Sequence, residues 1–501
     1  MENISVKNYR SIQDSGKIEL KPLTVIVGKN SAGKSSFIRF FPLLKQTLER
    51  KISESILWYG DYVDLGDYKQ VLSKQSNGQS IKFSFEIKTH EQKRKYYYVG
   101  TNGKKKYLAN VEISVQEKYF DEIKISFYDQ IIELHMDKDG NAEIKINGDG
   151  SLFNEYRVVW YRDSGELIPN ITVIHKTNSD SYARYPSEEF TKKCKKLINA
   201  KKVKQIISLS FSLWDDEIDI PLGSKQDILN RLKKENEEKF GSKEIHHKRF
   251  LNINNLIIAS KLSRIIEDIN ESISSDMKQT NYIKPIRAMV DRYYRVQGIS
   301  IDELDADGSN LPMILHNMNP ENLREFECWS KEKFGVVFSV TKGVGHVSLI
   351  IKNEVDGNEE TNMADTGYGY SQMLPIVVML WMLHKKNINS KKEKLTRTIV
   401  IEQPELHLHP AYQAKMVDVF VNVINEALNA GIDIKVIFET HSEAMINRIG
   451  RLISSKKFSA DKVNVLVFDK IEEKTIIQSK KFNEKGLLMG WPMDFFSTEE
   501  V

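Results

Sequence analysis

The first 27 residues have the spacing of short strands that lead into a turn. Apolar side chains alternate around Ile4, return around Ile18, and form an unbroken run over residues 23–27. An apolar run of this length that ends at glycine is typical of a buried strand. The pattern after the turn predicts a helix over residues 35–50, bent at Pro42 because proline removes a helical hydrogen bond.

Residues 81–146 contain several short β-like runs separated by turn signals. Asp139-Gly140 and Asn147-Gly148 are dipeptides that favour tight hairpin turns, since both positions tolerate a left-handed backbone. These signals predict an antiparallel sheet. Its expected strands are residues 82–87, 96–99, 111–115, 123–128 and 131–136.

The composition changes over residues 151–280, where Lys-rich and Glu-rich stretches with few turn residues predict a helical insertion. The expected helices in it are residues 191–204, 225–239 and 252–275.

After Tyr282 the pattern alternates between helix and strand, and such alternation indicates a mostly parallel sheet covered by helices. The expected elements are helix 371–385, strand 398–402, helix 412–430 and strands 434–439 and 463–469. The sequence therefore predicts an α/β fold in three parts. These parts are an N-terminal lobe over residues 1–150, a helical insertion over 151–280 and a C-terminal lobe over 281–501.

Composition excludes several classes of protein. The 501 residues are 40% hydrophobic and 28% charged, which is ordinary globular usage. The longest apolar run, residues 376–383, is too short to span a bilayer, and no basic segment followed by an apolar stretch opens the chain. The net charge of +4 gives no global indication of nucleic-acid binding. We therefore expect no membrane partner.

Cysteine usage bears on the compartment. Only Cys194 and Cys328 occur, which excludes a disulfide framework or a four-cysteine zinc site and suits a reducing environment. We expect both cysteines to be structural and the chain to be cytoplasmic.

Residues 28–35, Gly-Lys-Asn-Ser-Ala-Gly-Lys-Ser, match the phosphate-loop pattern and lie between a predicted strand and a predicted helix, as that pattern requires. In such a loop the backbone N–H groups and the helix N-terminus face the phosphates. Lys34 is expected to reach the β and γ oxygens, and Ser35 to ligate Mg²⁺. The sequence therefore predicts binding of ATP or GTP. The residues expected to contact the nucleotide are Gly28, Asn30, Ser31, Ala32, Gly33, Lys34, Ser35 and Ser36.

A second nucleotide motif is predicted where strand 398–402 ends in the carboxylate of Glu402. That position suits the coordination shell of Mg²⁺, so Ser35 and Glu402 are the expected metal residues. Gln403 follows, and an amide can orient water but cannot accept its proton. Either Gln403 orients the attacking water and hydrolysis is slow, or Glu405 supplies the negative charge. The sequence leaves both alternatives open.

A second strand, residues 434–439, leads to His441, which can reach the γ-phosphate and sense whether it is present. A histidine alone in such a place is more often structural, but its order after both nucleotide motifs favours a catalytic role. The expected catalytic residues are Lys34, Glu402, Gln403, Glu405 and His441.

Residues 365–372 precede an apolar helix and offer small residues and backbone amides at its N-terminus, which is a ready anion site. Gly369, Ser371 and Gln372 are expected to cap the γ-phosphate of an ATP held by another subunit. The plainer interpretation is a turn and helix cap.

Two further features have a weaker chemical meaning. His407 and His409 share a spacing seen in metal sites, but no third ligand with credible spacing lies nearby, which argues against zinc. A Lys-rich helix is usually a solvated face, and contact with nucleic acid is the alternative. Its lysines are Lys192, Lys193, Lys195, Lys196, Lys201, Lys202 and Lys204.

Taken in order, these motifs resemble the ABC-type ATPases of the RecF, SMC and OLD (overcoming lysogenisation defect) group. The resemblance extends over residues 1–75 and 280–496. The matching motifs are residues 6–12, 28–35, 401–410 and 439–442, and residues 282–287 and 491–496 narrow the resemblance to OLD-like ATPases of bacterial defence islands.

The resemblance implies an ABC-type ATPase head that carries an antiparallel β subdomain, with ATP and Mg²⁺ as cofactors. It implies that Gln403 is normal in the group and that residues 407–409 contact the second subunit of a dimer. Ser371 stands where the group's signature motif has glycine, so whether Gly369 or Ser371 contacts the γ-phosphate is left open.

The resemblance also implies a biological role. The chain is similar to stand-alone defence ATPases of the Septu or PARIS type, because no acidic metal-binding constellation follows His441. The implied function is an ATP-hydrolysing subunit of an anti-phage defence complex. It would act as a nucleotide-gated scaffold or sensor, self-associate through an ATP-sandwich dimer and control a separate effector, a nuclease.

Two other functions compete with this one. A DNA-repair or DNA-tethering ATPase of the RecF/SMC type is the main alternative, although no run sustains heptads for the length that coiled-coil arms need. The nucleotide-binding subunit of a membrane transporter is the other, and the large insertion and absent standard signature argue against it.

Overall fold

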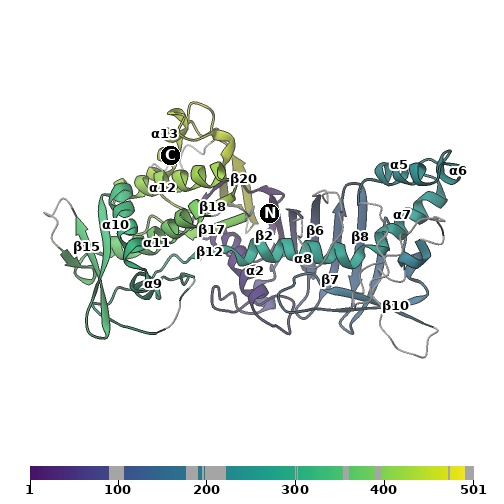
Figure 1. Cartoon of the computed structure of the whole chain (residues 1–501), viewed down its shortest axis with the longest axis horizontal. Coiled ribbons are helices and arrows are strands. Elements are labelled where there is room, and N and C mark those ends of the chain that lie inside the picture. Colours follow the sequence, from purple (N-terminus) through teal and green to yellow (C-terminus); the bar gives the residue numbers. More distant parts are fainter. Residues whose placement is uncertain are drawn as a thin grey trace. The chain divides into compact units, whose positions relative to one another are not determined.

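The computed structural model describes residues 1–89, 107–176, 190–194, 197, 222–298, 301, 303–353, 360–389, 396–471 and 474–490 (Figure 1). The chain forms two compact units. Unit 1 comprises Met1–Tyr9, Leu44–Tyr59 and Leu65–Lys278, and unit 2 comprises Arg10–Leu43, Gly60–Asp64 and Gln279–Val501. Each unit is assembled from segments that are distant in sequence, so the grouping differs from the three consecutive ranges expected from the sequence.

Unit 1 is built on an antiparallel sheet. Along β5 every second side chain is buried, so one face of the strand lies on a core. The hairpin between β8 and β9 turns at Gly140, whose φ of +84° is left-handed and suits glycine, as the sequence predicts. The strands follow the order β11 (Asn170–His175), β10 (Tyr156–Tyr161), β9 (Asn141–Ile146), β8 (Gln130–Met136), β7 (Phe120–Phe127), β6 (Leu108–Val115), β5 (Ile81–Lys88) and β1 (Asn3–Tyr9).

Helices α7 (Lys248–Ser260) and α8 (Leu262–Lys278) lie across this sheet (Figure 1). Asn270 of α8 is buried, and its Oδ1 accepts from the backbone N–H groups of Leu167 and Ile168 at 3.2 and 2.8 Å. Its Nδ2 donates to the carbonyl of Ile168 at 2.7 Å, so one amide fixes the helix to the loop before β11.

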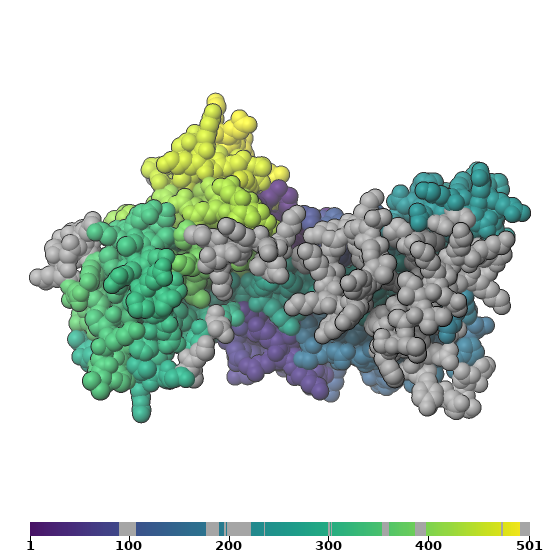
Figure 2. Space-filling model, viewed as in Figure 1, coloured from purple at the N-terminus to yellow at the C-terminus, as the bar shows by residue number. Residues whose placement is uncertain are grey.

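The remaining helices of unit 1 are short. Figure 2 shows α5 and α6 as a teal projection at one end of the unit. Their bounds, with those of the other short elements, are α3 (Tyr68–Val71), η1 (Ser151–Phe153), α5 (Lys225–Glu235) and α6 (Glu237–Phe240).

Unit 1 differs from the sequence-based expectation in where its helices begin. Strands β10 and β11 lie inside the range 151–280 that the sequence predicts as a helical insertion, because the antiparallel sheet continues to His175. The helix predicted over 252–275 is α7 and α8, which meet at Lys261. Of the helix predicted over 191–204, only residues 191–194 and 197 are described, and the strand predicted over 96–99 lies outside the described residues.

Unit 2 contains a six-stranded sheet whose central strand, β4, is buried at every position. Strands β12, β17, β18, β4 and β19 run parallel, and β20 is antiparallel to β19. The mostly parallel sheet and α/β class predicted from the sequence are confirmed. The order is β12 (Thr280–Ile283), β17 (Thr396–Glu402), β18 (Asp433–Glu439), β4 (Leu23–Gly28), β19 (Val463–Ile471) and β20 (Lys474–Lys480).

Helices of unit 2 share one apolar core with this sheet. The long helices are α10 (Pro320–Phe334), α11 (Tyr368–Asn389), α12 (Pro410–Asn429) and α13 (Glu443–Ser454). A smaller antiparallel sheet contains β13 (Tyr294–Arg295), β14 (Val336–Lys342), β15 (His346–Asn353) and β16 (Glu360–Asn362). The short elements are β2 (Ile12–Asp14), β3 (Ile18–Glu19), α1 (Lys34–Ile38), α9 (Leu311–Asn317), η3 (Met363–Asp365) and η4 (Ala460–Lys462).

The helix predicted over residues 35–50 is divided in two. Helix α1 ends at Ile38 and α2 (Phe40–Glu49) begins after Arg39, so the break falls at Arg39 and not at Pro42. Pro42 lies in the first turn of α2, where a backbone N–H has no helical partner to lose.

The two cysteines have different environments. Cys194 is buried, and burial raises the pKa of its thiol to about 12, which fits a structural residue. Cys328 is exposed, so the expectation that both cysteines are structural is not met by Cys328. Among the described residues, every helix is too short or too polar to cross a bilayer.

Candidate functional site

The phosphate loop follows β4 directly and depends on two glycines. A Cβ at Gly28 would lie 2.2 Å from the carbonyl oxygen of Phe468 on the neighbouring strand β19. Gly33 has a φ of +97°, and a Cβ there would lie 2.7 Å from Ser11 Oγ. Both positions therefore exclude larger residues, and the loop keeps the compact turn that the sequence pattern predicts.

Lys34 begins α1 and folds back over its own loop. Its Nζ donates to the carbonyl oxygens of Gly28 at 2.9 Å and Lys29 at 2.7 Å. Nζ also lies 3.9 Å from Glu439 Oε1. Burial lowers the pKa of Lys34, an effect that the charges of Glu439 and Glu405 oppose. The ammonium group thus lies inside the loop whose backbone would receive phosphate.

The other residues of the loop surround this lysine. Asn30 and Ser31 are exposed, and Ser31 has a left-handed φ of +61°. Ala32 is buried and donates its N–H to the carbonyl of Lys29 at 3.3 Å, while Ser36 is half-buried. All residues predicted to bind nucleotide here lie on one continuous segment, from the end of β4 through the loop to the start of α1.

Ser35 contacts a carboxylate that sequence analysis did not single out. Its Oγ donates to Glu439 at 3.2 Å from Oε1 and 3.0 Å from Oε2. Glu439 ends β18 and is 2% exposed, and burial, with the charge of Glu402, raises its pKa to about 7. The sequence did contain one signal, because Glu439, like Glu402, ends an apolar run of residues that predicts a buried strand.

Glu402 lies at the end of β17 with a different set of partners. Arg39 donates from Nε to Oε1 at 2.8 Å and from Nη2 to Oε2 at 2.9 Å. The Tyr282 hydroxyl donates to Oε1 at 2.5 Å. The ion pair raises the pKa of Arg39, and burial with the adjacent carboxylate raises that of Tyr282. Sequence analysis gave Arg39 no role and named Tyr282 only within a family motif.

The two candidates for orienting water lie in the turn after β17. Gln403 has a left-handed φ of +46°, and its N–H donates to the carbonyl of Glu439 at 3.0 Å. Glu405 Oε1 accepts from the backbone N–H of His441 at 2.7 Å, whereas its Oε2 is buried without a hydrogen bond. Burial raises the pKa of Glu405. The main-chain geometry thus brings both residues to the strand end that carries Glu439.

His441 follows β18 and is exposed. Burial of part of its ring and the charge of Lys34 lower its pKa, which favours the neutral imidazole. The structure therefore places Lys34, Ser35, Glu402, Gln403, Glu405 and His441 at one edge of the unit 2 sheet, and their catalytic roles stay predictions.

Arg287 contacts the turn that follows β17, and the sequence did not single it out as an individual residue. It is 3% exposed, and its Nη2 donates to the carbonyl of Glu402 at 2.9 Å. Its backbone N–H donates to Gln372 Oε1 at 3.3 Å. Burial lowers its pKa to about 10, against the attraction of Glu405 and Glu402. Arg287 thus connects the end of β17 with the start of α11.

The signature-like segment begins α11. A Cβ at Gly369 would lie 2.7 Å from the carbonyl oxygen of His407, so this position requires glycine. Ser371 is buried and its Oγ donates to the carbonyl of Tyr368 at 2.7 Å, and Gln372 is buried against Arg287. The predicted contact of these residues with ATP stays a prediction. The open backbone of this segment is at Gly367, which is exposed and where a Cβ would meet nothing within 4 Å.

The histidines and lysines noted in the sequence have ordinary structural contacts. His409 Nδ1 accepts from the N–H of Ala411 at 3.2 Å and caps α12, while His407 is exposed. Lys193 Nζ lies 3.1 Å from Glu155 Oε2 in unit 1. Lys192 is exposed, and the other lysines of that predicted helix lie outside the described residues.

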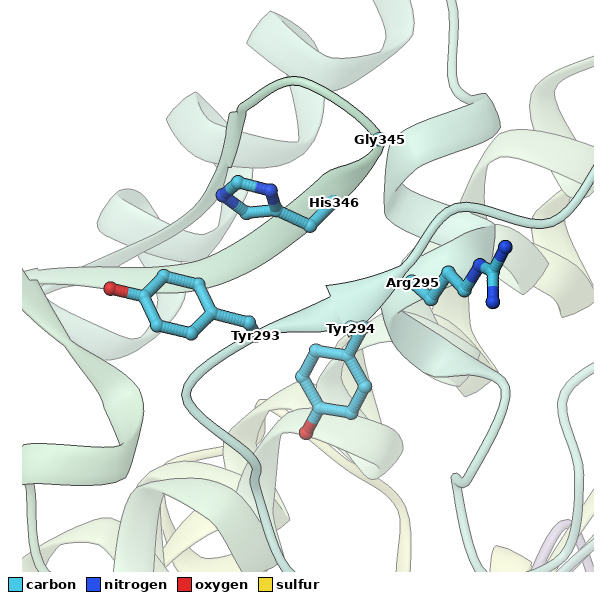
Figure 3. Close-up of a pocket in the computed structure, with 5 residues that line it drawn as sticks. All are labelled: Tyr293, Tyr294, Arg295, Gly345 and His346. Atoms are coloured by element: carbon cyan, nitrogen blue, oxygen red, sulfur yellow. The ribbon is translucent and has the colours of Figure 1, made fainter.

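A pocket elsewhere in unit 2 contains none of the predicted site residues. Its volume is about 670 Å³, and its lining is Tyr293, Tyr294, Arg295, Gly345 and His346. Figure 3 shows the rings of Tyr293 and His346 turned toward each other, with centroids 5.2 Å apart, and Arg295 directed away from them. This pocket is separate from the motifs that predict nucleotide binding.

The donor set beside the phosphate loop fits a magnesium ion. Mg²⁺ prefers oxygen ligands and usually takes one or two from protein side chains, with water and phosphate supplying the rest. Ser35 provides a hydroxyl, and Glu439 and Glu402 provide carboxylates at adjacent strand ends. Among the described residues, no group of three or more His, Cys, Asp and Glu side chains forms a metal cluster.

Comparisons with known proteins bear on this geometry. A family model described as AAA ATPase domain matches residues 1–446. Among curated proteins, none matches the sequence. Among solved structures, the SMC head domain from Thermotoga maritima is similar over 95% of this chain and 98% of that chain, with 8% identity and a TM-score of 0.35. A similarity of that size is too slight to bear on function.

Proposed function

Because the chain belongs to the AAA ATPase domain family and is an ATPase, we propose that it serves as the nucleotide-gated subunit of a cytoplasmic anti-phage defence complex. In this role it binds Mg-ATP, associates with a second copy of itself and controls a separate effector, a nuclease. The observation that carries the nucleotide part is the convergence of Lys34, Ser35 and Glu439 at one edge of the unit 2 sheet.

The residues of the loop have defined tasks in this proposal. Backbone N–H groups of residues 28–35 and the ammonium of Lys34 hold the phosphates, since both are positive and converge on one turn. When bound, Mg²⁺ polarises the phosphoryl oxygens and offsets their charge. His441, whose pKa is lowered by burial and by the charge of Lys34, stands beside the same turn and senses the γ-phosphate.

Orientation of the attacking water falls to Gln403 or Glu405. Glu405 is supported by its free Oε2, and Gln403 by a main chain held in a fixed left-handed conformation. Gln403→Ala and Glu405→Ala separate the two, because only the residue that orients water lowers kcat while leaving ATP affinity unchanged.

Self-association follows from the start of α11. The open backbone at Gly367, before the first turn of α11, offers N–H groups to the γ-phosphate of an ATP held by a second copy, in a two-fold arrangement. ATP then joins the two copies, and its hydrolysis releases them. The defence role and the effector rest on the resemblance of the motifs at residues 282–287 and 491–496 to OLD-like ATPases.

The test combines binding and protection. Lys34→Ala is expected to abolish ATP binding and protection of cells against phage when the chain is expressed with its neighbouring gene product. Lys457→Ala removes an exposed lysine of the same unit and is expected to change neither. Co-purification with that gene product identifies the effector. Unchanged ATP affinity in Lys34→Ala would overturn the nucleotide site.

The DNA-tethering alternative has a distinct outcome. A chain that grips DNA through phosphate contacts loses affinity steeply as salt rises. If the chain alone binds DNA in an ATP-dependent and salt-sensitive way, DNA tethering is its function and the defence role is wrong.

A further inference from the structure

Two carboxylates lie side by side at the ends of neighbouring parallel strands, and their surroundings differ. Glu402 ends β17 and Glu439 ends β18, and the two are register partners in the sheet. Both are almost fully buried, at 1% and 2% exposure. The sequence predicts that Glu402 is the carboxylate that ligates the metal. The contacts of the two carboxylates test that assignment.

The carboxylate of Glu402 is already occupied. A carboxylate offers about four lone-pair directions, and Arg39 and the Tyr282 hydroxyl take three of them. The two bonds from Arg39 form a bidentate, charge-assisted pair, which is among the stronger hydrogen-bond arrangements that a carboxylate makes in proteins. The guanidinium also places a positive charge 2.8 Å from Glu402, closer than the 3.9 Å between Lys34 Nζ and Glu439, and this charge disfavours a divalent cation there.

Glu439 has the opposite character. Among the residues that the structure describes, its carboxylate contacts only Ser35 Oγ and Lys34 Nζ, and both of these belong to the phosphate loop. Ser35 is the residue whose hydroxyl ligates the metal in phosphate-loop enzymes. The carboxylate nearest to that hydroxyl is therefore Glu439.

The distance between these oxygens agrees with a shared ion. Two neighbouring ligands of an octahedral Mg²⁺, each at about 2.1 Å, lie about 3.0 Å apart. Ser35 Oγ lies 3.0 and 3.2 Å from the two carboxylate oxygens of Glu439. The hydroxyl oxygen of Ser35 and a carboxylate oxygen of Glu439 therefore have a separation that is compatible with ligation of one ion.

The geometry points to Glu439, and not Glu402, as the carboxylate of the Mg²⁺ site beside Ser35, with Glu402 serving to anchor Arg39 and Tyr282. This inference rests on the proposed nucleotide function. It changes the metal set expected from sequence, Ser35 and Glu402, to Ser35 and Glu439. Glu402 becomes a positioning residue that fixes the strand end through Arg39.

Nucleotide affinity with and without magnesium tests this assignment. A fluorescent ATP analogue is titrated into wild type, Glu439→Gln and Glu402→Gln, in Mg²⁺ and in EDTA, and the ratio of the two dissociation constants is measured. Glu439→Gln is expected to reduce that ratio at least about tenfold, and Glu402→Gln to leave it unchanged. In EDTA, Glu439→Gln should bind no more weakly than wild type, because a negative charge beside the phosphates is gone.

Conservative variants serve as controls for misfolding, and a spectroscopic signal from the metal provides a direct measure of its binding. Glu439→Asp keeps the charge and should retain part of the magnesium effect, and Glu402→Asp substitutes for Glu402→Gln if that variant does not fold. The EPR signal of Mn²⁺ in the presence of nucleotide reports metal binding without turnover, and it should weaken only in the Glu439 variants.

The outcomes separate this inference from the proposed function. Loss of the magnesium effect in the Glu402 variants, or its retention in Glu439→Gln, would overturn the assignment while the ATPase stands. Failure of the wild-type chain to bind the ATP analogue under either condition would instead remove the proposed function.

Discussion

Arg39 and Glu402, 363 positions apart in the sequence, are joined by two hydrogen bonds of 2.8 and 2.9 Å. The side chain of Glu402 is 2% exposed and that of Arg39 is 30% exposed. This pair connects the residue after α1 with the end of β17 inside unit 2. It therefore ties the helix that follows the phosphate loop to the sheet.

Removal of the arginine should be costly. Arg39→Ala leaves a buried carboxylate without its cation, and unfolding free energy should fall by about 3 kcal/mol. Chemical denaturation measures the loss. The double variant Arg39→Ala with Glu402→Gln should recover part of it, because the uncompensated charge is gone. Equal stabilities of Arg39→Ala and wild type would contradict the structural role.

Two glycines of the signature-like segment provide a matched comparison. Gly369→Ala places a Cβ 2.7 Å from the carbonyl of His407, whose own φ of +60° leaves little freedom to move. We expect a loss of about 1–3 kcal/mol in Gly369→Ala. Gly367→Ala meets nothing within 4 Å and should change stability by less than about 0.5 kcal/mol. Thermal melts distinguish the two, and a reversed order would show that the segment is arranged differently.

Stability should depend on pH through Glu439. Its pKa is raised from 4.5 to about 7, so the folded state holds a proton more tightly than the unfolded chain between these values. Unfolding free energy of the nucleotide-free protein should therefore fall as pH rises from 4.5 to about 7. Glu439→Gln cannot titrate, and its curve of denaturation midpoint against pH should be flatter. Parallel curves for variant and wild type would refute this expectation.

Asn270 offers a test of unit 1. Asn270→Ala removes three hydrogen bonds and leaves the buried N–H groups of Leu167 and Ile168 without partners. The expected cost is about 2–4 kcal/mol of unfolding free energy. Ser274→Ala on the same helix is the control and should cost less than about 0.5 kcal/mol. A similar small effect in both variants would mean that the amide is not a significant anchor.

The thiols should differ in reactivity. Cys328 is exposed and should react with a thiol reagent in the native protein, whereas the pKa of about 12 at buried Cys194 keeps that residue protonated. A native titration should give one fast thiol, and denaturant should reveal the second. Cys328→Ser should abolish the fast phase, and a persistent fast phase would place Cys194 at the surface.

The hydrophobic and polar pattern along the chain was sufficient to predict those parts of the site that are contiguous in sequence. The loop over residues 28–35 carries its own strand, turn and helix start, and the apolar run before Glu402 marks a buried strand end. The parallel sheet followed from the alternation of helices and strands. These features depend on neighbours along the chain, which a single sequence displays.

The hydrophobic pattern could not predict contacts between side chains on different strands of the sheet. The pairing of Ser35 with Glu439 depends on β18 being the neighbour of β4, and strand order leaves no mark in hydrophobic periodicity. Arg39, which pairs with Glu402, lies at the break between α1 and α2, three positions before the proline from which the sequence predicts a bend. In unit 1, the short β10 lies after a change of composition, so the end of the antiparallel sheet was set too early.

Strand β4 has β18 on one side and β19 on the other. During translation this strand leaves the ribosome long before residues 433–439 and 463–471 are made. Until then an apolar strand has both edges unpaired, and such edges attract foreign strands. The nascent chain therefore cannot complete the sheet around its phosphate loop until residues 433–471 have been made, so this loop is synthesised long before it can reach its folded surroundings.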